Sequence, residues 1–214
     1  MKLILARHGN TFGPGDTPVW VGGRNDMALV EKGLEQARAA ADALTHILPA
    51  DTRICAAPLK RTHVFAQTIA ADRFAVTVDE RLREVHYGTW AMRSNDEIRE
   101  EYGQAPLDEW SKFGRYPDGA GFEPPIDTIR GGLHDLAGEL QASGASTALC
   151  VSSNGILRHF LSLIPGAYED FEARHAFKVL TGNLCALDLA AQKVLFWNLT
   201  PQEADESLTS LFAD

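Results

Sequence analysis

The stretch Leu3-Ile4-Leu5-Ala6-Arg7-His8-Gly9-Asn10-Thr11 places four apolar residues directly before a run of polar ones. A short apolar run that stops abruptly is typical of a buried β-strand that ends in a polar loop. Packing against such a strand fixes the orientation of a histidine that follows it, and that histidine can serve as a nucleophile or an acid–base group. The stretch therefore predicts a strand over residues 3–6 with a chemically active loop at its carboxyl end.

The same pattern recurs along the chain. A predicted strand over Ser146–Val151 leads into the polar Ser152-Ser153-Asn154-Gly155 and then a helix from Ile156. The other predicted strands are Thr52–Ala56, Phe74–Val78, Cys185–Leu189 and Lys193–Leu199, and the predicted helices are Val30–Leu48, Leu59–Ala71, Asp96–Tyr102, Leu107–Phe113 and Ile126–Ser143. Strands that alternate with helices predict an α/β fold, a three-layer α/β/α sandwich around a mostly parallel sheet.

Length and composition limit the classes of protein to which this chain can belong. Its 214 residues suit one domain over 1–214, with an acidic, loosely held end over Pro201–Asp214. The formal net charge of -9 argues against nucleic acid or an acidic membrane as a partner, although a pocket can be positive inside an acidic protein. Three widely spaced cysteines indicate free thiols in a reducing compartment and no metal motif. We therefore expect a cytoplasmic protein without a membrane span or a bound metal.

Two further stretches carry candidate chemistry. Arg61, in Ala57-Pro58-Leu59-Lys60-Arg61, falls in the first turns of a predicted helix, where a cation gains nothing from the helix dipole unless an anion binds there. Glu84, in a loop with Tyr87 and Trp90, could have a raised pKa and act as a general acid. Taken alone, each stretch also fits an ordinary surface arginine or glutamate.

Together these stretches resemble the signature of the histidine phosphatase superfamily, whose fold is phosphoglycerate mutase-like. Six stretches carry the resemblance in the family's own order: Arg7-His8-Gly9-x-Thr11, the run from Gly23 to Ala37, Pro58-Leu59-Lys60-Arg61, Glu84-Val85-His86-Tyr87-Gly88, Val151-Ser152-Ser153-Asn154-Gly155-Ile156-Leu157-Arg158 and Gly182-Asn183. Because they span most of the chain in one order, coincidence is improbable. The resemblance implies a single histidine phosphatase-like domain.

The resemblance also implies residue roles. His8 would be the nucleophile and form a phosphohistidine, while Arg7 and Arg61 would clamp the phosphate oxygens. Glu84 would protonate the leaving oxygen and later activate water. Two guanidinium groups supply the charge that phosphoryl transfer needs, so no cofactor or metal is expected.

One position departs from the family. Ser153 stands where the resemblance places a second pocket histidine, and a hydroxyl carries no positive charge. Losing one preorganised donor slows such chemistry roughly a hundredfold to a thousandfold. Asn154 can supply an amide donor if its side chain turns inward, so both residues are predicted phosphate contacts. The residues expected on the substrate side are Thr11, Gly23 and Tyr87.

Three functions stay open on the sequence. The first is a phosphomonoesterase that acts through His8, slowed by Ser153. The second is a phosphate-ester binding or regulatory protein with impaired catalysis. The third is phosphotransfer of the phosphoglycerate mutase type, which the Glu84–Gly88 stretch favours and the chain length disfavours. Each predicts a small-molecule phosphate ester as partner, and the resemblance adds an expected homodimer.

Overall fold

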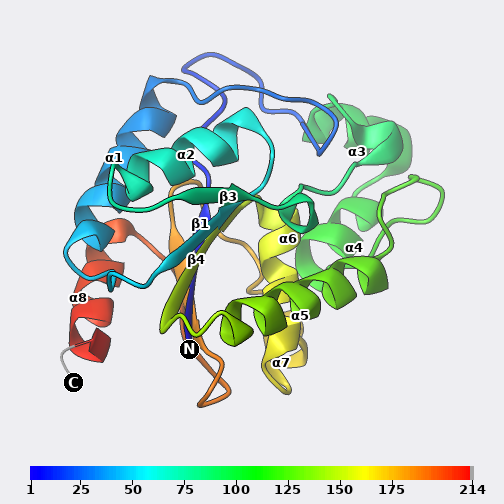
Figure 1. The fold of residues 1–214 in the computed structure, drawn as a ribbon. Helices are drawn as coiled ribbons and strands as arrows, with labels where there is room; N and C mark the ends of the chain where they lie inside the picture. Colours follow the sequence, from blue (N-terminus) through cyan, green and yellow to red (C-terminus); the bar gives the residue numbers. More distant parts are fainter. Residues whose placement is uncertain (213–214) are drawn as a thin grey trace.

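Six strands form one mixed sheet in the order β3-β2-β4-β1-β5-β6 in the computed structural model, which describes residues 1–212 (Figure 1). The strands are β1 (Lys2–Arg7), β2 (Arg53–Ala56), β3 (Val76–Val78), β4 (Thr147–Ser152), β5 (Leu184–Asp188) and β6 (Lys193–Leu199). Strands β1 to β4 are mutually parallel, whereas β5 runs antiparallel to β1 and pairs with β6 as a hairpin.

Both faces of the sheet are buried, which explains why β1 is apolar at every central position. Leu3 and Leu5 belong to one core cluster and Ile4 and Ala6 to another, because successive side chains of a strand point to opposite faces. All four side chains are fully buried. A strand covered on two faces reads as a continuous apolar run, as the sequence predicted.

Helices cover the two faces as separate layers (Figure 1). One layer contains α1 (Glu31–Thr45), α2 (Lys60–Ala70) and α8 (Pro201–Phe212). The other layer contains α4 (Ala105–Phe113), α5 (Ile126–Ala142), α6 (Asn154–Leu157), the 3₁₀ segment η3 (Arg158–Leu163) and α7 (Ala167–Ala173). The short helix α3 (Asn95–Tyr102) contacts α4. The predicted three-layer α/β/α architecture is confirmed.

The prediction for the end of the chain was wrong. Residues 201–212 form α8 rather than a loose tail, and Ala204 and Leu208 are fully buried in the core cluster beneath α1. Thr200 and Glu203 exchange side-chain and backbone hydrogen bonds as a capping box, which fixes the start of the helix. Residues 213 and 214 lie outside the described residues.

The parallel strands bring the predicted polar loops to one edge of the sheet. In the parallel register Arg7 is opposite Ser152 on β4, and the backbone N–H of His8 donates to the carbonyl of Ser152 at 3.1 Å. Strand β2 ends beside β4 at Ala56 and leads into α2, which carries Arg61. Ligands of α/β sheets bind beyond the carboxyl ends of parallel strands, so this edge is where a site is expected.

Two findings bear on the expected environment of the protein. All three cysteines are free and buried. Among the helices formed by residues 1–212, none is both long enough and apolar enough to span a bilayer.

Candidate active site

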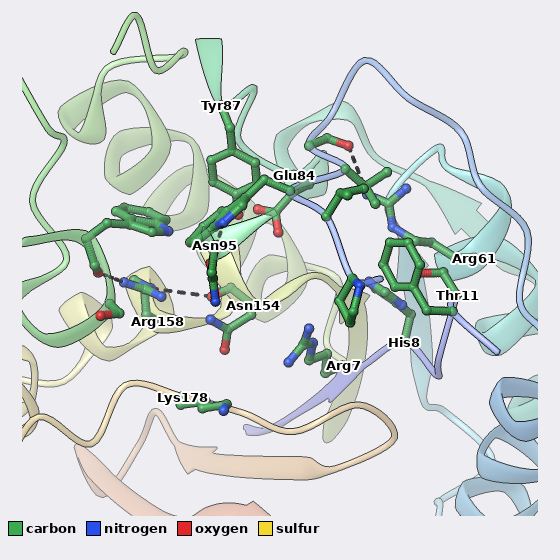
Figure 2. Close-up of a pocket in the computed structure, with 18 residues that line it drawn as sticks. Arg7, His8, Thr11, Arg61, Glu84, Tyr87, Asn95, Asn154, Arg158 and Lys178 are labelled. Atoms are coloured by element: carbon green, nitrogen blue, oxygen red, sulfur yellow. Dashed lines mark hydrogen bonds between the residues drawn. The ribbon is translucent and has the colours of Figure 1, made fainter. Parts of the chain in front are cut away.

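A cavity of about 440 Å³ opens at the carboxyl edge of the sheet, and Figure 2 shows the side chains around it. Its lining includes these predicted site residues: Arg7, His8, Thr11, Arg61, Glu84, Tyr87 and Asn154. They come from β1, the loop after it, α2, the segment before α3, and α6, and the fold brings them together.

The imidazole of His8 is held in one orientation by its own loop. Its Nδ1 lies 2.7 Å from the carbonyl oxygen of Gly9. Because a carbonyl only accepts, Nδ1 carries the proton and Nε2 keeps a free lone pair. Burial, and then the nearby charges of Arg61 and Arg7, hold the pKa of His8 well below its usual 6.5. The ring is therefore neutral at neutral pH, which is the form that a nucleophile requires.

Gly9 permits this arrangement because it has no side chain. A Cβ atom at Gly9 would lie 2.4 Å from the carbonyl oxygen of Gly33, in the first turn of α1. The loop after β1 can thus press against α1 and keep the carbonyl of Gly9 under the His8 ring.

Two guanidinium groups flank His8, and neither has an ion-pair partner among residues 1–212. Arg7 donates from Nη1 to the carbonyl of Val179 at 2.6 Å, and its Nε makes no hydrogen bond. Arg61 is 2% exposed and donates to the carbonyls of Gly22 and Asn25, each at 3.1 Å. Burial lowers the pKa of both arginines, yet a guanidinium stays charged in proteins. Two guanidinium groups beside a neutral imidazole can bind the oxygens of a phosphate group.

Glu84 holds its carboxylate against the amino-terminal end of α6. Its Oε2 accepts from the backbone N–H of Gly155 at 3.2 Å, and its Oε1 accepts from that of Val85 at 2.8 Å. The hydroxyl of Tyr87 is also close, and burial, followed by the charge of Glu84, raises the pKa of Tyr87 well above its ordinary value. The carboxylate lies between the His8 end of the cavity and its aromatic wall (Figure 2).

Aromatic side chains form the wall that extends away from His8. Trp20 packs edge-on against Tyr87, with ring centroids 4.9 Å apart, and Trp110 lies 6.1 Å from Tyr87 in the same manner. The indole N–H of Trp20 donates to Oδ1 of Asn95 at 2.8 Å, which fixes the loop after β1 to α3. Phe12 also lines the cavity. The wall gives a ligand in this cavity an apolar surface.

Several cavity residues were not singled out from the sequence, among them Arg158, Lys178 and Asn95. Arg158 lies in the quoted Val151–Arg158 stretch, so a signal was present, and its side chain lines the cavity while being 2% exposed. Lys178 lines the cavity from the segment before β5, and Asn95 does so from the start of α3. No local pattern in the sequence marks Lys178 or Asn95.

Two residues with predicted roles, Gly23 and Ser153, are not among those that line the cavity. Gly23 is outside the cavity lining, because its backbone packs against that of Glu84; a Cβ atom at Gly23 would lie 2.1 Å from the Glu84 carbonyl oxygen. Ser153 precedes α6 and is 2% exposed, its Oγ has no hydrogen-bond partner within residues 1–212, and it is absent from the lining. Gly23 therefore packs closely against the backbone that carries Glu84, and its contact with a substrate stays a prediction.

No group of three or more His, Cys, Asp or Glu residues within the described part of the chain is arranged to hold a metal ion. The side chains that line the cavity include four cationic ones, those of Arg7, Arg61, Arg158 and Lys178.

The chain is similar to known proteins in sequence and in fold. The chain is 30% identical over 174 residues to the probable phosphoglycerate mutase GpmB of Salmonella arizonae, covering 78% of this chain and 75% of that protein. The mycobacterial glucosyl-3-phosphoglycerate phosphatase superposes with a TM-score of 0.75 at 23% identity, over 93% of this chain and 99% of that one. The alpha-ribazole phosphatase of Shigella flexneri gives 0.70 at 21% identity, over 94% and 96%. A family model described as histidine phosphatase superfamily (branch 1) matches residues 3–200, and the chain belongs to this superfamily.

Proposed function

We propose that this protein is a phosphomonoesterase that acts through a phosphohistidine at His8. The observation that carries the proposal is the Nδ1 hydrogen bond to Gly9, which leaves Nε2 as the free ring atom in a cavity with two unpaired guanidinium groups. Activated imidazole and neutralised phosphate oxygens are the two requirements of phosphoryl transfer to nitrogen.

In the first step, Nε2 of His8 attacks the phosphorus and the bond from phosphorus to the leaving oxygen breaks. Arg7 and Arg61 offset the charge on the equatorial phosphate oxygens. Glu84, in its protonated form, gives its proton to the leaving oxygen, and an alcohol departs. The enzyme then holds a phosphorus–nitrogen bond at His8 and a carboxylate at Glu84.

In the second step, water attacks the phosphorus of the phosphohistidine and the phosphorus–nitrogen bond breaks. The Glu84 carboxylate takes a proton from that water, so the residue returns to its starting form. Inorganic phosphate leaves, and Nε2 regains its lone pair. The hydrogen bond of Oε2 to Gly155 keeps the carboxylate on the leaving-group side in both steps.

Ser153 favours one alternative, a phosphate-ester binding or regulatory protein with impaired turnover. Its hydroxyl adds no positive charge, and its Oγ is buried without a partner. A second alternative is transfer of the phosphoryl group to an acceptor alcohol. The similarity to relatives named phosphoglycerate mutase supports it. We place the protein in the cytoplasm, which its three free thiols support.

Release of phosphate from a generic aryl phosphate tests the proposal. We expect hydrolysis by the wild-type protein and none above the buffer blank by His8→Ala. Absence of hydrolysis from acid to neutral pH, in protein that still binds phosphate, would support the binding alternative. Label that moves from the ester to an added phosphoglycerate, without release of inorganic phosphate, would support the mutase.

A further inference from the structure

Arg158 is a buried cation that the proposed phosphoryl transfer does not use. Its Nη1 donates to the carbonyl of Trp110 at 2.6 Å, and its guanidinium lies 4.1 Å from the centroid of the Trp110 ring. Phe177 lies on a further side at 5.6 Å. No carboxylate pairs with Arg158 in the part of the chain that the structure describes. A buried unpaired charge is costly, so an anion that enters the cavity would relieve that cost.

Asn154 points a free donor into the same part of the cavity. Its Oδ1 accepts from the backbone N–H of Val179 at 2.8 Å, and this bond fixes which end of the amide is the acceptor. The NH₂ group then has no hydrogen-bond partner within residues 1–212. The Nε of Arg158 donates to the backbone carbonyl of Asn154 at 3.5 Å, which places the guanidinium beside the start of α6.

Lys178 adds a third donor to this group. It is exposed, lines the cavity, and forms no ion pair within the described residues. Figure 2 shows Arg158, Asn154 and Lys178 on the side of the cavity away from Arg61 and His8. The two groups of donors therefore lie at different ends of one cavity.

The cavity lining carries more positive charge than one bound phosphate group would neutralise. The cationic lining residues are Arg7, Arg61, Arg158 and Lys178, and Glu84 is the one carboxylate among the lining residues. With Glu84 ionised this is a formal excess of three positive charges, and with Glu84 protonated, as the proposed first step requires, it is four; a phosphate dianion offsets two of them. A further anionic group on the same substrate would offset the rest. Trp20, Tyr87 and Trp110 line the same cavity and give the body of such a substrate an apolar surface.

We propose that Arg158, Asn154 and Lys178 form a second anion subsite. The substrate is then a phosphate monoester whose leaving alcohol has an apolar or aromatic body and carries a carboxylate or a second phosphate. The inference rests on the proposed function for the position of the scissile phosphate at His8. It adds the chemical class of the leaving group.

Paired aryl phosphates test the subsite. The first ester is meta-carboxyphenyl phosphate, and its control is meta-carbamoylphenyl phosphate, in which a neutral amide replaces the carboxylate. Resorcinol bisphosphate is the third ester and carries a second phosphate in place of the carboxylate. The readout is the ratio of kcat/KM for each charged ester to that for the neutral ester. This ratio is compared between wild-type protein, Lys178→Gln and the matched control Lys193→Gln. The intrinsic reactivity of each ester is the same for all three proteins, so it cancels from the comparison. Lys193 is exposed and lies outside the cavity lining.

We expect at least one charged ester to be favoured about tenfold in the wild-type protein, and Lys178→Gln to lose most of that preference. The arm with the larger preference identifies carboxylate or phosphate as the second anion. Arg158→Met, checked for folding by thermal unfolding, should lose the preference as well. Lys193→Gln should keep it. An equal ratio in wild type and Lys178→Gln would overturn the subsite.

Different results would overturn the anion subsite and the phosphatase activity. Hydrolysis of all three esters with no preference for charge overturns the subsite alone. If no ester is hydrolysed, the phosphatase proposal fails, and calorimetric titration of wild-type protein with the same esters decides the subsite. Tighter binding of a charged ester, lost in Lys178→Gln, would then support it, and equal binding would overturn it.

Discussion

The carboxylate of Glu84 accepts a hydrogen bond from the backbone N–H of Gly155, 71 positions along the chain, at 3.2 Å. A Cβ atom at Gly155 would lie 2.3 Å from Oε1 of Glu84 and 2.9 Å from the Tyr87 hydroxyl. The space that Glu84 occupies therefore exists because position 155 has no side chain. This close approach links the start of α6 to the proposed acid–base group.

Gly155→Ala is expected to displace the Glu84 carboxylate and lower kcat by about a hundredfold, since a misplacement of about 1 Å costs that much in positioned catalysis. Steady-state kinetics with an aryl phosphate measure the effect. The control is Gly131→Ala, an exposed helical position with nothing within 4 Å of the added atom, which should keep full activity. Equal kcat in the two variants would contradict the proposed role of Glu84.

His8 should remain neutral at pH values where a free imidazole is half protonated. Burial and the charges of Arg61 and Arg7 hold its pKa well below 6.5. Ring-nitrogen chemical shifts, followed by NMR against pH, should show a neutral ring with the proton on Nδ1 down to below pH 6.5. Arg61→Gln removes one like charge beside the imidazolium and should raise the pKa of His8. A wild-type midpoint at or above 6.5 would rule out this environment.

His159 should make the folded protein sensitive to acid. It is fully buried, neither ring nitrogen has a partner within the described residues, and it stacks on Tyr168. Burial, and then the charges of Arg158 and Arg130, lower its pKa well below 6.5. The unfolded chain therefore binds the proton first, and stability is lost as pH falls below about 6.5, by about 1.4 kcal/mol per pH unit for each such histidine.

The variant His159→Phe keeps the stacked ring and removes this titration. Denaturant unfolding at several pH values should give a slope of the unfolding free energy, below pH 6.5, that is smaller by about 1.4 kcal/mol per pH unit. An unchanged slope would show that His159 does not contribute to the acid sensitivity.

Arg61→Ala should weaken competitive inhibition by inorganic phosphate by about tenfold or more, because a charge-assisted hydrogen-bonding group is lost. Inhibition constants measured at one ionic strength give the comparison. Arg53→Ala, which removes an exposed arginine from β2, is the matched control and should leave inhibition unchanged. Equal inhibition of the Arg61 variant and wild type would remove Arg61 from the phosphate site.

Ser153→His should raise turnover, by up to about a hundredfold, if the loss of a pocket imidazole limits the chemistry. The larger side chain must turn from the buried position of Ser153 into the cavity, so folding is checked by thermal unfolding. Unchanged or lower kcat in a folded variant would count against Ser153 as the weak point of the site.

The sequence predicted that one cavity would contain Arg7, His8 and Arg61, because local sequence patterns indicate the ends of the strands that precede them. Apolar runs that end abruptly mark strand ends, and parallel strands place their carboxyl ends together. The family resemblance then supplied the order of the motifs. Burial on both faces of the sheet followed from the same runs.

Other features depend on partners that are distant in sequence. Arg158 is in the cavity because Trp110 and Phe177, from two other segments, hold its guanidinium. Lys178 has no pattern around it that marks a site. The helix α8 did have a signal, since Thr200 and Glu203 have the spacing of a capping box; the prediction of a loose end rested on acidic composition and did not use that spacing.

Trapping of the phosphorylated protein tests the role of His8 most directly. The protein is mixed with a phosphorus-labelled aryl phosphate, quenched in alkali, and digested for mapping of the modified peptide. We predict one phosphoryl group on the nitrogen of His8, stable to base and labile to acid, and absent in His8→Ala. Turnover of the ester with label on another residue, or with none on His8, would contradict the account.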